Sequence, residues 1–128
     1  MSLSHVLWLA LGGALGTLTR AGVAALAVRW LGRDLPWGTL AVNLLGSFAF
    51  GLIVALGRGR LGLPTGLETV VLVGFLGGFT TYSSFAFQSV DLLEQGRLTV
   101  ALAYVGGTVF VGLLAVWAGL LVGRSLGG

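Results

Sequence analysis

The sequence predicts an all-α membrane protein of four transmembrane helices, in a single domain that takes up residues 1–128. Composition is the first reason, because 56% of the 128 residues are hydrophobic, only 9% are charged and the mean hydropathy is +1.02. A chain with so little polar surface cannot enclose its apolar residues in water. The second reason is that charges and turn residues divide the chain into four long apolar stretches.

These four stretches follow one another with short connections. At about 1.5 Å of rise per residue, roughly 20 helical residues cross a hydrocarbon core of ~30 Å. The expected spans are residues 4–28, 37–56, 67–93 and 98–122. Pro36 and Pro64 each stand just before a span, where the missing backbone N–H is harmless. The connections leave no segment long enough for a domain in water, so nearly all of the chain should be helical.

The first stretch carries closely spaced glycines and one deep arginine. Gly12 and Gly16 form a G-x-x-x-G pair, a spacing typical of transmembrane helices that approach one another closely. The same spacing recurs in Gly74 with Gly78 and in Gly119 with Gly123. Arg20 lies inside the span, where it can snorkel to the interface or serve as a vestibule charge that concentrates anions.

Neutral polar side chains line one face of the second stretch. Thr39, Asn43 and Ser47 recur every four residues, which places them in a row on a helix. The fourth stretch repeats this offset in Tyr104, Thr108 and Gly112. Such hydroxyl and amide groups can donate hydrogen bonds to an anion but offer a cation little. The alternative is that the hydroxyls bond helix carbonyls and pack neighbouring helices, although an amide such as that of Asn43 is costlier to bury.

The third stretch should break at GGFTTYSS, residues 77–84, which combines glycines with hydroxyl residues of low helix propensity. A break at membrane depth leaves carbonyl and N–H groups unpaired, and these are tolerated only where protein, ion or water satisfies them. Freed carbonyls of Gly77, Gly78 or Thr80 can hold a cation of the size of Na⁺, whereas freed N–H groups and hydroxyls suit an anion. Aromatic ring edges within the segment also carry partial positive charge.

Nucleophiles, bases and metal ligands are too few for enzyme chemistry. The chain has one histidine, His5, and no cysteine, so neither a hydrolase nor a metalloenzyme site can be assembled. The four acids lie in the first connection or near the ends of the third stretch: Asp34, Glu68, Asp91 and Glu94. The arginines are scattered singly and form no basic face for a nucleic acid. We therefore expect a protein that is not an enzyme and binds no nucleic acid.

Arginines in the connections normally decide how a membrane protein is oriented. The two sides of a four-span chain would carry Arg58, Arg60 and Arg124 on one and Arg29, Arg33 and Arg97 on the other. This balance gives no preferred orientation. It is compatible with insertion in both orientations and head-to-tail pairing, and equally with a chance balance of small numbers.

Three motifs in order, GGALGTLTR, GTLAVNLLGSFAFG and GFLGGFTTYSSF, resemble those of the Fluc (CrcB) family of fluoride channels. The resemblance covers the whole chain, and the second and third motifs are the specific ones. It implies a fluoride-selective channel for passive fluoride export that lowers cytoplasmic fluoride, multi-pass in the cell inner membrane or plasma membrane. It also implies an antiparallel, dual-topology homodimer with two pores between the subunits and a structural Na⁺ on the dimer axis.

The resemblance further implies roles for individual residues. The residues that it assigns to the fluoride pore are Asn43, Tyr82, Phe85, Ser83, Ser84, Thr39, Tyr104 and Thr108. Arg20 is similar to the family's vestibule arginine, and the backbone carbonyls of Gly77 and Thr80 correspond to its Na⁺ ligands. Tyr82 departs from the family, which usually has phenylalanine there, so its ring edge, its hydroxyl or neither can face the ion.

Two other functions remain as alternatives. A small four-span multidrug-type cation exporter, antiparallel in some cases, would need an acid within the membrane, and the first two spans contain none. A structural subunit of a larger membrane complex would explain the glycines but not the polar rows on the second and fourth spans.

Overall fold

The computed structural model describes residues 1–59 and 62–127, and all regular structure in these ranges is helical. The helices are α1 (Leu3–Leu31), α2 (Trp37–Arg58), α3 (Thr65–Thr69), the π-helix η1 (Val70–Leu76), α4 (Gly77–Phe79), α5 (Tyr82–Glu94) and α6 (Leu98–Gly127). Counting Thr65–Glu94 as one crossing, the described residues form four helices long and apolar enough to span a membrane. The predicted all-helical membrane fold is therefore confirmed.

Most helix ends lie close to the predicted ones, but two helices are longer. α1 continues to Leu31 and stops at Gly32, whose φ of 83° lies in the left-handed region that glycine adopts without strain. α6 continues past the predicted end at residue 122 to Gly127, with Arg124 in its last turn. A cation there interacts favourably with the negative end of the helix dipole, so the charge does not end the helix.

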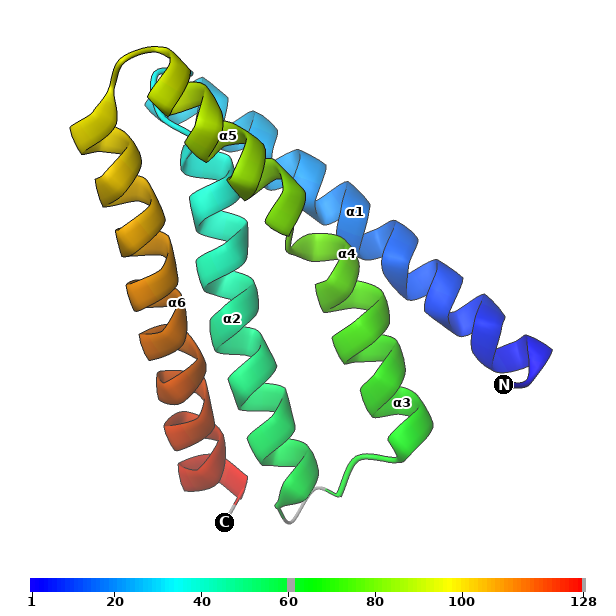
Figure 1. The fold of residues 1–128 in the computed structure, drawn as a ribbon. Helices are drawn as coiled ribbons and strands as arrows, with labels where there is room; N and C mark the ends of the chain where they lie inside the picture. The colour runs from blue at the N-terminus through cyan, green and yellow to red at the C-terminus, as the bar shows by residue number, and fades with distance from the viewer. Residues whose placement is uncertain (60–61, 128) are drawn as a thin grey trace.

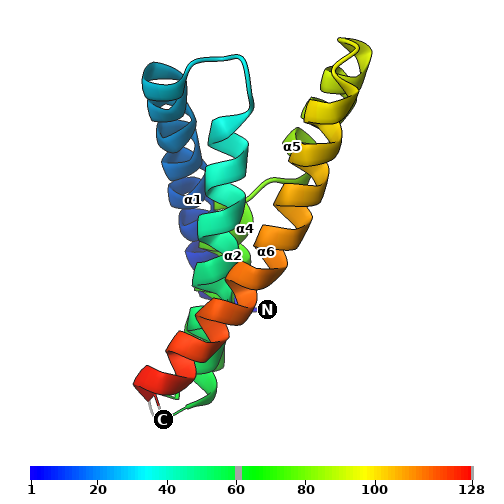
Figure 2. The ribbon, with the colours of Figure 1, turned by 90° about the vertical axis from the view of Figure 1, so that its left-hand side faces the viewer.

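The helices form two groups that separate toward one end. α2 packs along α6, and α1 packs against α2, η1 and α4, whereas α5 packs on α6. Both chain ends lie at one end of the molecule, and the α1–α2 and α5–α6 connections lie at the other (Figure 1). Figure 2 shows α1 and α2 diverging from α5 and α6 toward that second end. Arg60, part of the predicted charge balance, lies outside the described residues.

Glycines allow the helix backbones to approach one another closely. A Cβ at Gly78 would lie 2.6 Å from Gly13 O, and a Cβ at Gly123 would lie 2.8 Å from Leu52 O. The other glycines of the three G-x-x-x-G pairs also lie in close contact with a neighbouring helix, which confirms their packing role: Gly12, Gly16, Gly74 and Gly119. Because no larger residue fits at Gly78 or Gly123, these contacts fix how far α1 and α6 stand from their neighbours.

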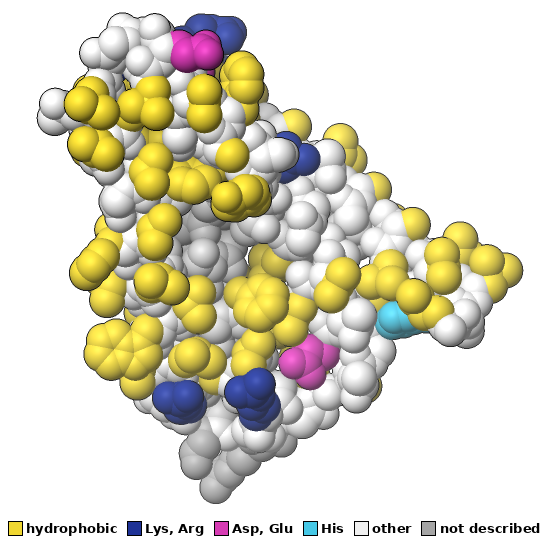
Figure 3. Space-filling model, viewed as in Figure 1, with side chains coloured by type: hydrophobic (Ala, Val, Ile, Leu, Met, Phe, Trp, Pro, Cys, Tyr) yellow, Lys and Arg dark blue, Asp and Glu magenta, His cyan; other side chains and the backbone are white. Residues whose placement is uncertain are grey.

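The outer surface is apolar in the manner of a membrane protein. Large hydrophobic side chains are exposed along the helices, including Trp8 at 58%, Phe110 at 69% and Leu113 at 67%. On the face drawn in Figure 3, hydrophobic side chains cover the body of the molecule, and most charged ones lie near its two ends. Such a surface is stable in contact with lipid tails, so the chain is a multi-pass membrane protein.

Candidate functional site

The third crossing is interrupted midway by two extended residues. α4 ends at Phe79, after which Thr80 (φ −89°, ψ 160°) and Thr81 (φ −150°, ψ 117°) leave the helical region, and α5 begins at Tyr82. The predicted break is therefore confirmed, and it falls within the predicted segment. Upstream of it, η1 is a stretch of π-helix that the sequence pattern did not indicate; such stretches are frequent near functional sites.

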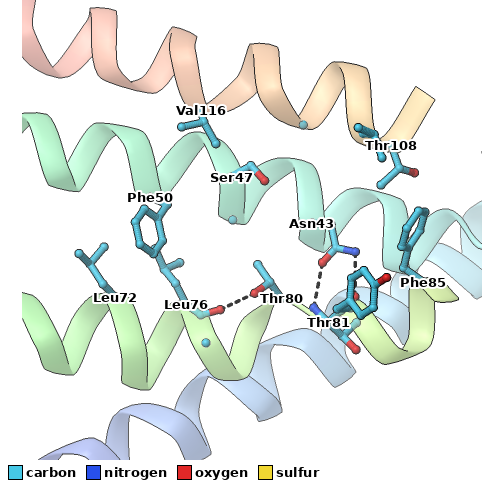
Figure 4. A pocket seen from close by; sticks show the side chains of 15 residues that line it. Asn43, Ser47, Phe50, Leu72, Leu76, Thr80, Thr81, Phe85, Thr108 and Val116 are labelled. Atoms are coloured by element: carbon cyan, nitrogen blue, oxygen red, sulfur yellow. Dashed lines mark hydrogen bonds between the residues drawn. The ribbon is translucent and has the colours of Figure 1, made fainter. Parts of the chain in front are cut away.

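The side chain of Asn43, on α2, hydrogen-bonds the backbone of the break. Its Nδ2 donates to Thr81 O at 3.0 Å, and its Oδ1 accepts from Thr81 N at 2.8 Å (Figure 4). One side chain thus satisfies both backbone groups of an extended residue that lies within the membrane, where an unpaired group would be costly. An amide carries two N–H groups, so one N–H of Asn43 remains available for another acceptor.

Two carbonyls at the break lose the donors that a continuous helix would give them. The N–H of Thr81, which would bond Gly77 O, is bonded to Asn43 instead. The N–H of Ser84, which would bond Thr80 O, is bonded to Thr81 Oγ1 at 3.3 Å. Gly77 and Thr80 are the two residues predicted from the resemblance to supply carbonyls to a cation, a role that stays a prediction.

Arg20 satisfies a third carbonyl at the same break. Its Nε donates to Gly78 O at 2.9 Å, so one lone pair of this carbonyl, the third considered as a cation ligand, is already used. The neighbouring Leu76 O accepts from both Thr80 N and Thr80 Oγ1, each at 2.9 Å. The partly buried Arg20 is therefore tied to the break through its Nε, and its role as a vestibule charge stays a prediction.

A cavity of about 470 Å³ adjoins the break, between α2, α6 and the two halves of the third crossing. Its lining includes six of the predicted site residues: Asn43, Gly77, Thr80, Tyr82, Phe85 and Thr108. Ser47 and Gly112, which belong to the two predicted rows on α2 and α6, also line it. Thr108 Oγ1 is buried and has no hydrogen-bond partner among the described residues, so this hydroxyl is a donor without an acceptor. The described lining contains no charged side chain.

Aromatic rings stand at one side of this cavity. The ring centroids of Phe85 and Tyr104 are 5.3 Å apart at an interplanar angle of 54°, and those of Tyr82 and Phe85 are 6.1 Å apart at 59°. Tilted rings present their positive edges to neighbours. Phe85 is half-buried, whereas Tyr82 is 80% exposed in this single chain. Tyr82 and Phe85, both assigned to the pore by the resemblance, are thus neighbours whose rings are tilted relative to each other.

The remaining predicted pore residues lie outside the lining of this cavity. Thr39 lines a second cavity of about 270 Å³ near the α1–α2 connection, together with Gln88 and Asp91. Ser83 is exposed, and the Ser84 hydroxyl accepts from Thr81 Oγ1 at 3.1 Å. Four of the eight residues therefore line the large cavity and Thr39 lines the second cavity. The lining of neither cavity includes Ser83, Ser84 or Tyr104.

A sequence model described as "CrcB-like protein, Camphor Resistance (CrcB)" matches residues 7–120. The chain belongs to the CrcB family. Three curated relatives, each named "Fluoride-specific ion channel FluC", align over nearly their whole lengths. The Magnetococcus marinus protein is 45% identical over 122 residues, which cover 95% of this chain and 99% of the relative. The Hydrogenovibrio crunogenus protein is 44% identical over 124 residues (94% and 94%), and the Solidesulfovibrio magneticus protein 47% over 119 (93% and 95%).

In this CrcB chain, polar contacts between the two cavities pass through Gln88, a residue that the sequence did not single out. Gln88 lines the second cavity, and its Oε1 accepts a hydrogen bond from Tyr104 Oη at 3.1 Å. Tyr104 in turn contacts the Phe85 ring, so Gln88 continues the polar groups from the large cavity toward the connection end. The spacing of four residues from Ser84 to Gln88 could have indicated it, since it repeats the offset of the rows on α2 and α6.

Proposed function

We propose that this chain forms a fluoride-selective channel that lets fluoride leave the cytoplasm passively. The observation that carries the proposal is the uncharged cavity at the break, which presents hydrogen-bond donors without carboxylates. The spare N–H of Asn43, the partnerless hydroxyl of Thr108 and the ring edge of Phe85 all belong to its lining. The names of the CrcB relatives, found across nearly the full length of the chain, support the same activity and do not support the cation exporter.

The chemistry of fluoride explains why such a lining suits it. A small anion holds its water strongly, so a pore must replace that water with several donors. Neutral donors and ring edges release an anion more readily than a fixed buried cation would, which favours rapid passage over tight binding. The described lining of this cavity offers no carboxylate for a metal cation. We place the protein in the inner membrane of a bacterial cell, as expected for an export channel with these bacterial relatives.

We expect purified protein in proteoliposomes to release trapped fluoride and to retain chloride. The reason is that hydroxyl, amide and ring-edge donors at this small site can replace the water of fluoride, whereas chloride is larger. Fluoride and chloride efflux would be followed in parallel with ion-selective electrodes after a K⁺ ionophore is added. Protein-free vesicles are the control. Equal flux of the two anions, or no fluoride flux from correctly folded protein, would refute the proposal.

We further propose that the channel is an antiparallel homodimer with two pores between its subunits. Two observations support it. The donors of α2, α5 and α6 face a cavity that this chain encloses from one side, so a second chain is needed to complete a pathway. Apart from the deeper Arg20, the arginines are balanced between the two sides, which is compatible with insertion in both orientations.

The same break suggests where the two subunits meet. Gly77 and Thr80 each carry a carbonyl deprived of its helix donor, and Gly77 is exposed in the single chain. Carbonyl oxygens of unwound backbone are suitable ligands for Na⁺. Two from each subunit would give four oxygens about a two-fold axis, so the residues present fit the proposed structural ion. Its contribution would be to coordinate these carbonyl oxygens, which otherwise lack donors, where the two chains meet.

Gly77→Leu is expected to convert the dimer to monomer without unfolding the chain. A Cβ at Gly77 meets nothing closer than Leu72 O at 3.9 Å, and its backbone is helical (φ −62°), so one chain accommodates a side chain there. Cross-linking between cysteines introduced at opposite helix ends, together with light scattering in detergent, would measure the dimer and its orientation.

Gly22→Leu is the matched control for this substitution. Gly22 also has open space around its Cβ, but it lies on α1 and forms no part of the third crossing. We expect it to keep the dimer and to keep any thermal stabilisation by Na⁺ over choline, which Gly77→Leu should lose. A dimer unchanged in Gly77→Leu, or cross-links between parallel subunits alone, would contradict the proposed assembly.

A further inference from the structure

A small basic cavity lies at the end of α2 and α6, far from the break. It measures about 220 Å³ and is lined by Ala55, Arg58, Gly59, Leu120, Arg124 and Gly127. Arg58 is the last residue of α2, and Arg124 lies in the last turn of α6. Two guanidinium groups from neighbouring helices thus border one hollow at the membrane surface.

Neither arginine is neutralised within the described part of the chain. The ion pair found there joins Arg97 to Asp34 at the opposite end, and the described hydrogen bonds include none from Arg58 or Arg124. The acid at this end is Glu68, whose carboxyl carbon would lie 3.5 Å from a Cβ at Gly57. Residue 57 precedes Arg58 on α2, yet no Glu68–Arg58 contact within ion-pair distance occurs among these residues. Within the described residues, the hollow therefore presents two guanidinium groups that are paired with no acid.

We infer that this cavity binds the phosphate of an anionic phospholipid. Arginine presents paired N–H donors that match phosphate oxygens, and two arginines can engage one phosphate from two sides. The walls supplied by Ala55 and Leu120 are apolar and continue toward the membrane interior, where the acyl chains would lie. The cavity is smaller than the ~300–1,000 Å³ typical of whole drug-sized ligands, which suits a headgroup.

The depth of the site favours a lipid over a dissolved anion. The two arginines lie at the ends of membrane-spanning helices, where headgroups gather and basic side chains meet anionic lipids. Trp117, 58% exposed, lies two turns inward on α6, a position typical of the boundary between headgroups and tails. A lipid held between α2 and α6 would support the contact along which these two helices pack.

Thermal unfolding of the 128-residue chain in a maltoside detergent tests the site without any measurement of flux. We expect phosphatidylglycerol to raise the Tm in a saturable way, and phosphatidylcholine with the same acyl chains, or inorganic phosphate at the same concentration, to leave it nearly unchanged. Arg58→Gln and Arg124→Gln should each raise the half-saturating concentration of phosphatidylglycerol about tenfold, since one charged hydrogen-bonding partner is lost. Each shift is measured from the lipid-free Tm of the same variant, so a general loss of stability does not affect it.

Arg29→Gln is the control, because Arg29 is an exposed arginine in the last turn of α1 at the opposite end. It should keep the full response to phosphatidylglycerol. Arg124→Lys, which keeps the charge and loses the paired donors, should give a response between the wild type and Arg124→Gln. An undiminished shift in the Arg58→Gln/Arg124→Gln double variant would overturn the inference. An equal loss in Arg29→Gln, an equal shift from phosphatidylcholine or a full shift from inorganic phosphate would also overturn it.

Discussion

Asn43→Ala is expected to reduce fluoride efflux at least about tenfold and to lower the free energy of unfolding by about 1–4 kcal/mol. The substitution removes both hydrogen bonds that Asn43 makes to Thr81, at 3.0 and 2.8 Å, and leaves an N–H and a C=O of extended backbone unpaired within the membrane. It also removes the spare amide N–H from the cavity. Efflux from proteoliposomes and chemical unfolding in detergent would measure the two effects separately.

Two further substitutions distinguish the structural role of the Asn43 side chain, its bonds to Thr81, from its place in the lining of the cavity. Ser47→Ala alters the next polar residue of the same row, which lines the same cavity but holds no part of the break, and should leave stability nearly unchanged. Asn43→Asp keeps an acceptor for Thr81 N–H but places a carboxylate without a counter-charge against Thr81 O, so it should be at least as destabilised as Asn43→Ala. Wild-type flux and wild-type stability in Asn43→Ala would show that the break does not depend on this side chain.

Phe85→Ile is expected to reduce fluoride efflux at least about tenfold while costing only about 0.5–1.5 kcal/mol of stability. Isoleucine keeps an apolar side chain beside Leu92, Ala101 and Tyr104, against whose cluster Phe85 packs. It removes the ring and with it the positive edge that we propose faces a passing anion. Efflux and thermal unfolding of the same preparation would separate the two effects.

Phe110→Ile is the matched control, because Phe110 is 69% exposed on α6 and lies outside the lining of the cavity at the break. It makes the same chemical change and should leave fluoride flux within about twofold of wild type. If the two variants lost flux equally, or if Phe85→Ile kept it, the ring edge of Phe85 would have no special role.

The break in the third crossing could be predicted because its causes are local. Glycines and hydroxyl residues of low helix propensity stand together in residues 77–84, and the structure leaves the helix at Thr80 and Thr81. The spans themselves follow from apolar length, and the rows on α2 and α6 follow from the helical period. All of these depend on residues a few positions apart.

The bonds that stabilise the break could not be predicted from the sequence. Asn43 and Thr81 are 38 residues apart, and Arg20 and Gly78 are 58 apart, so their pairing depends on how α1 and α2 pack on the third crossing. For the same reason the polar row alone could not show that Thr39 lines a different cavity from Asn43. Packing also brings Gln88 to Tyr104, since the two lie on α5 and α6.

The two extended residues at Thr80 and Thr81 have an electrostatic consequence. They divide one crossing into two half-helices, so that a negative dipole end at Phe79 and a positive dipole end at Tyr82 stand near the middle of the membrane. An uninterrupted helix would place both ends at the membrane surfaces, where water screens them. The interruption gives the low-dielectric interior two opposite partial charges of about half a unit each, a few ångströms apart, and the guanidinium of Arg20, which is bonded to Gly78 O, lies at the negative one.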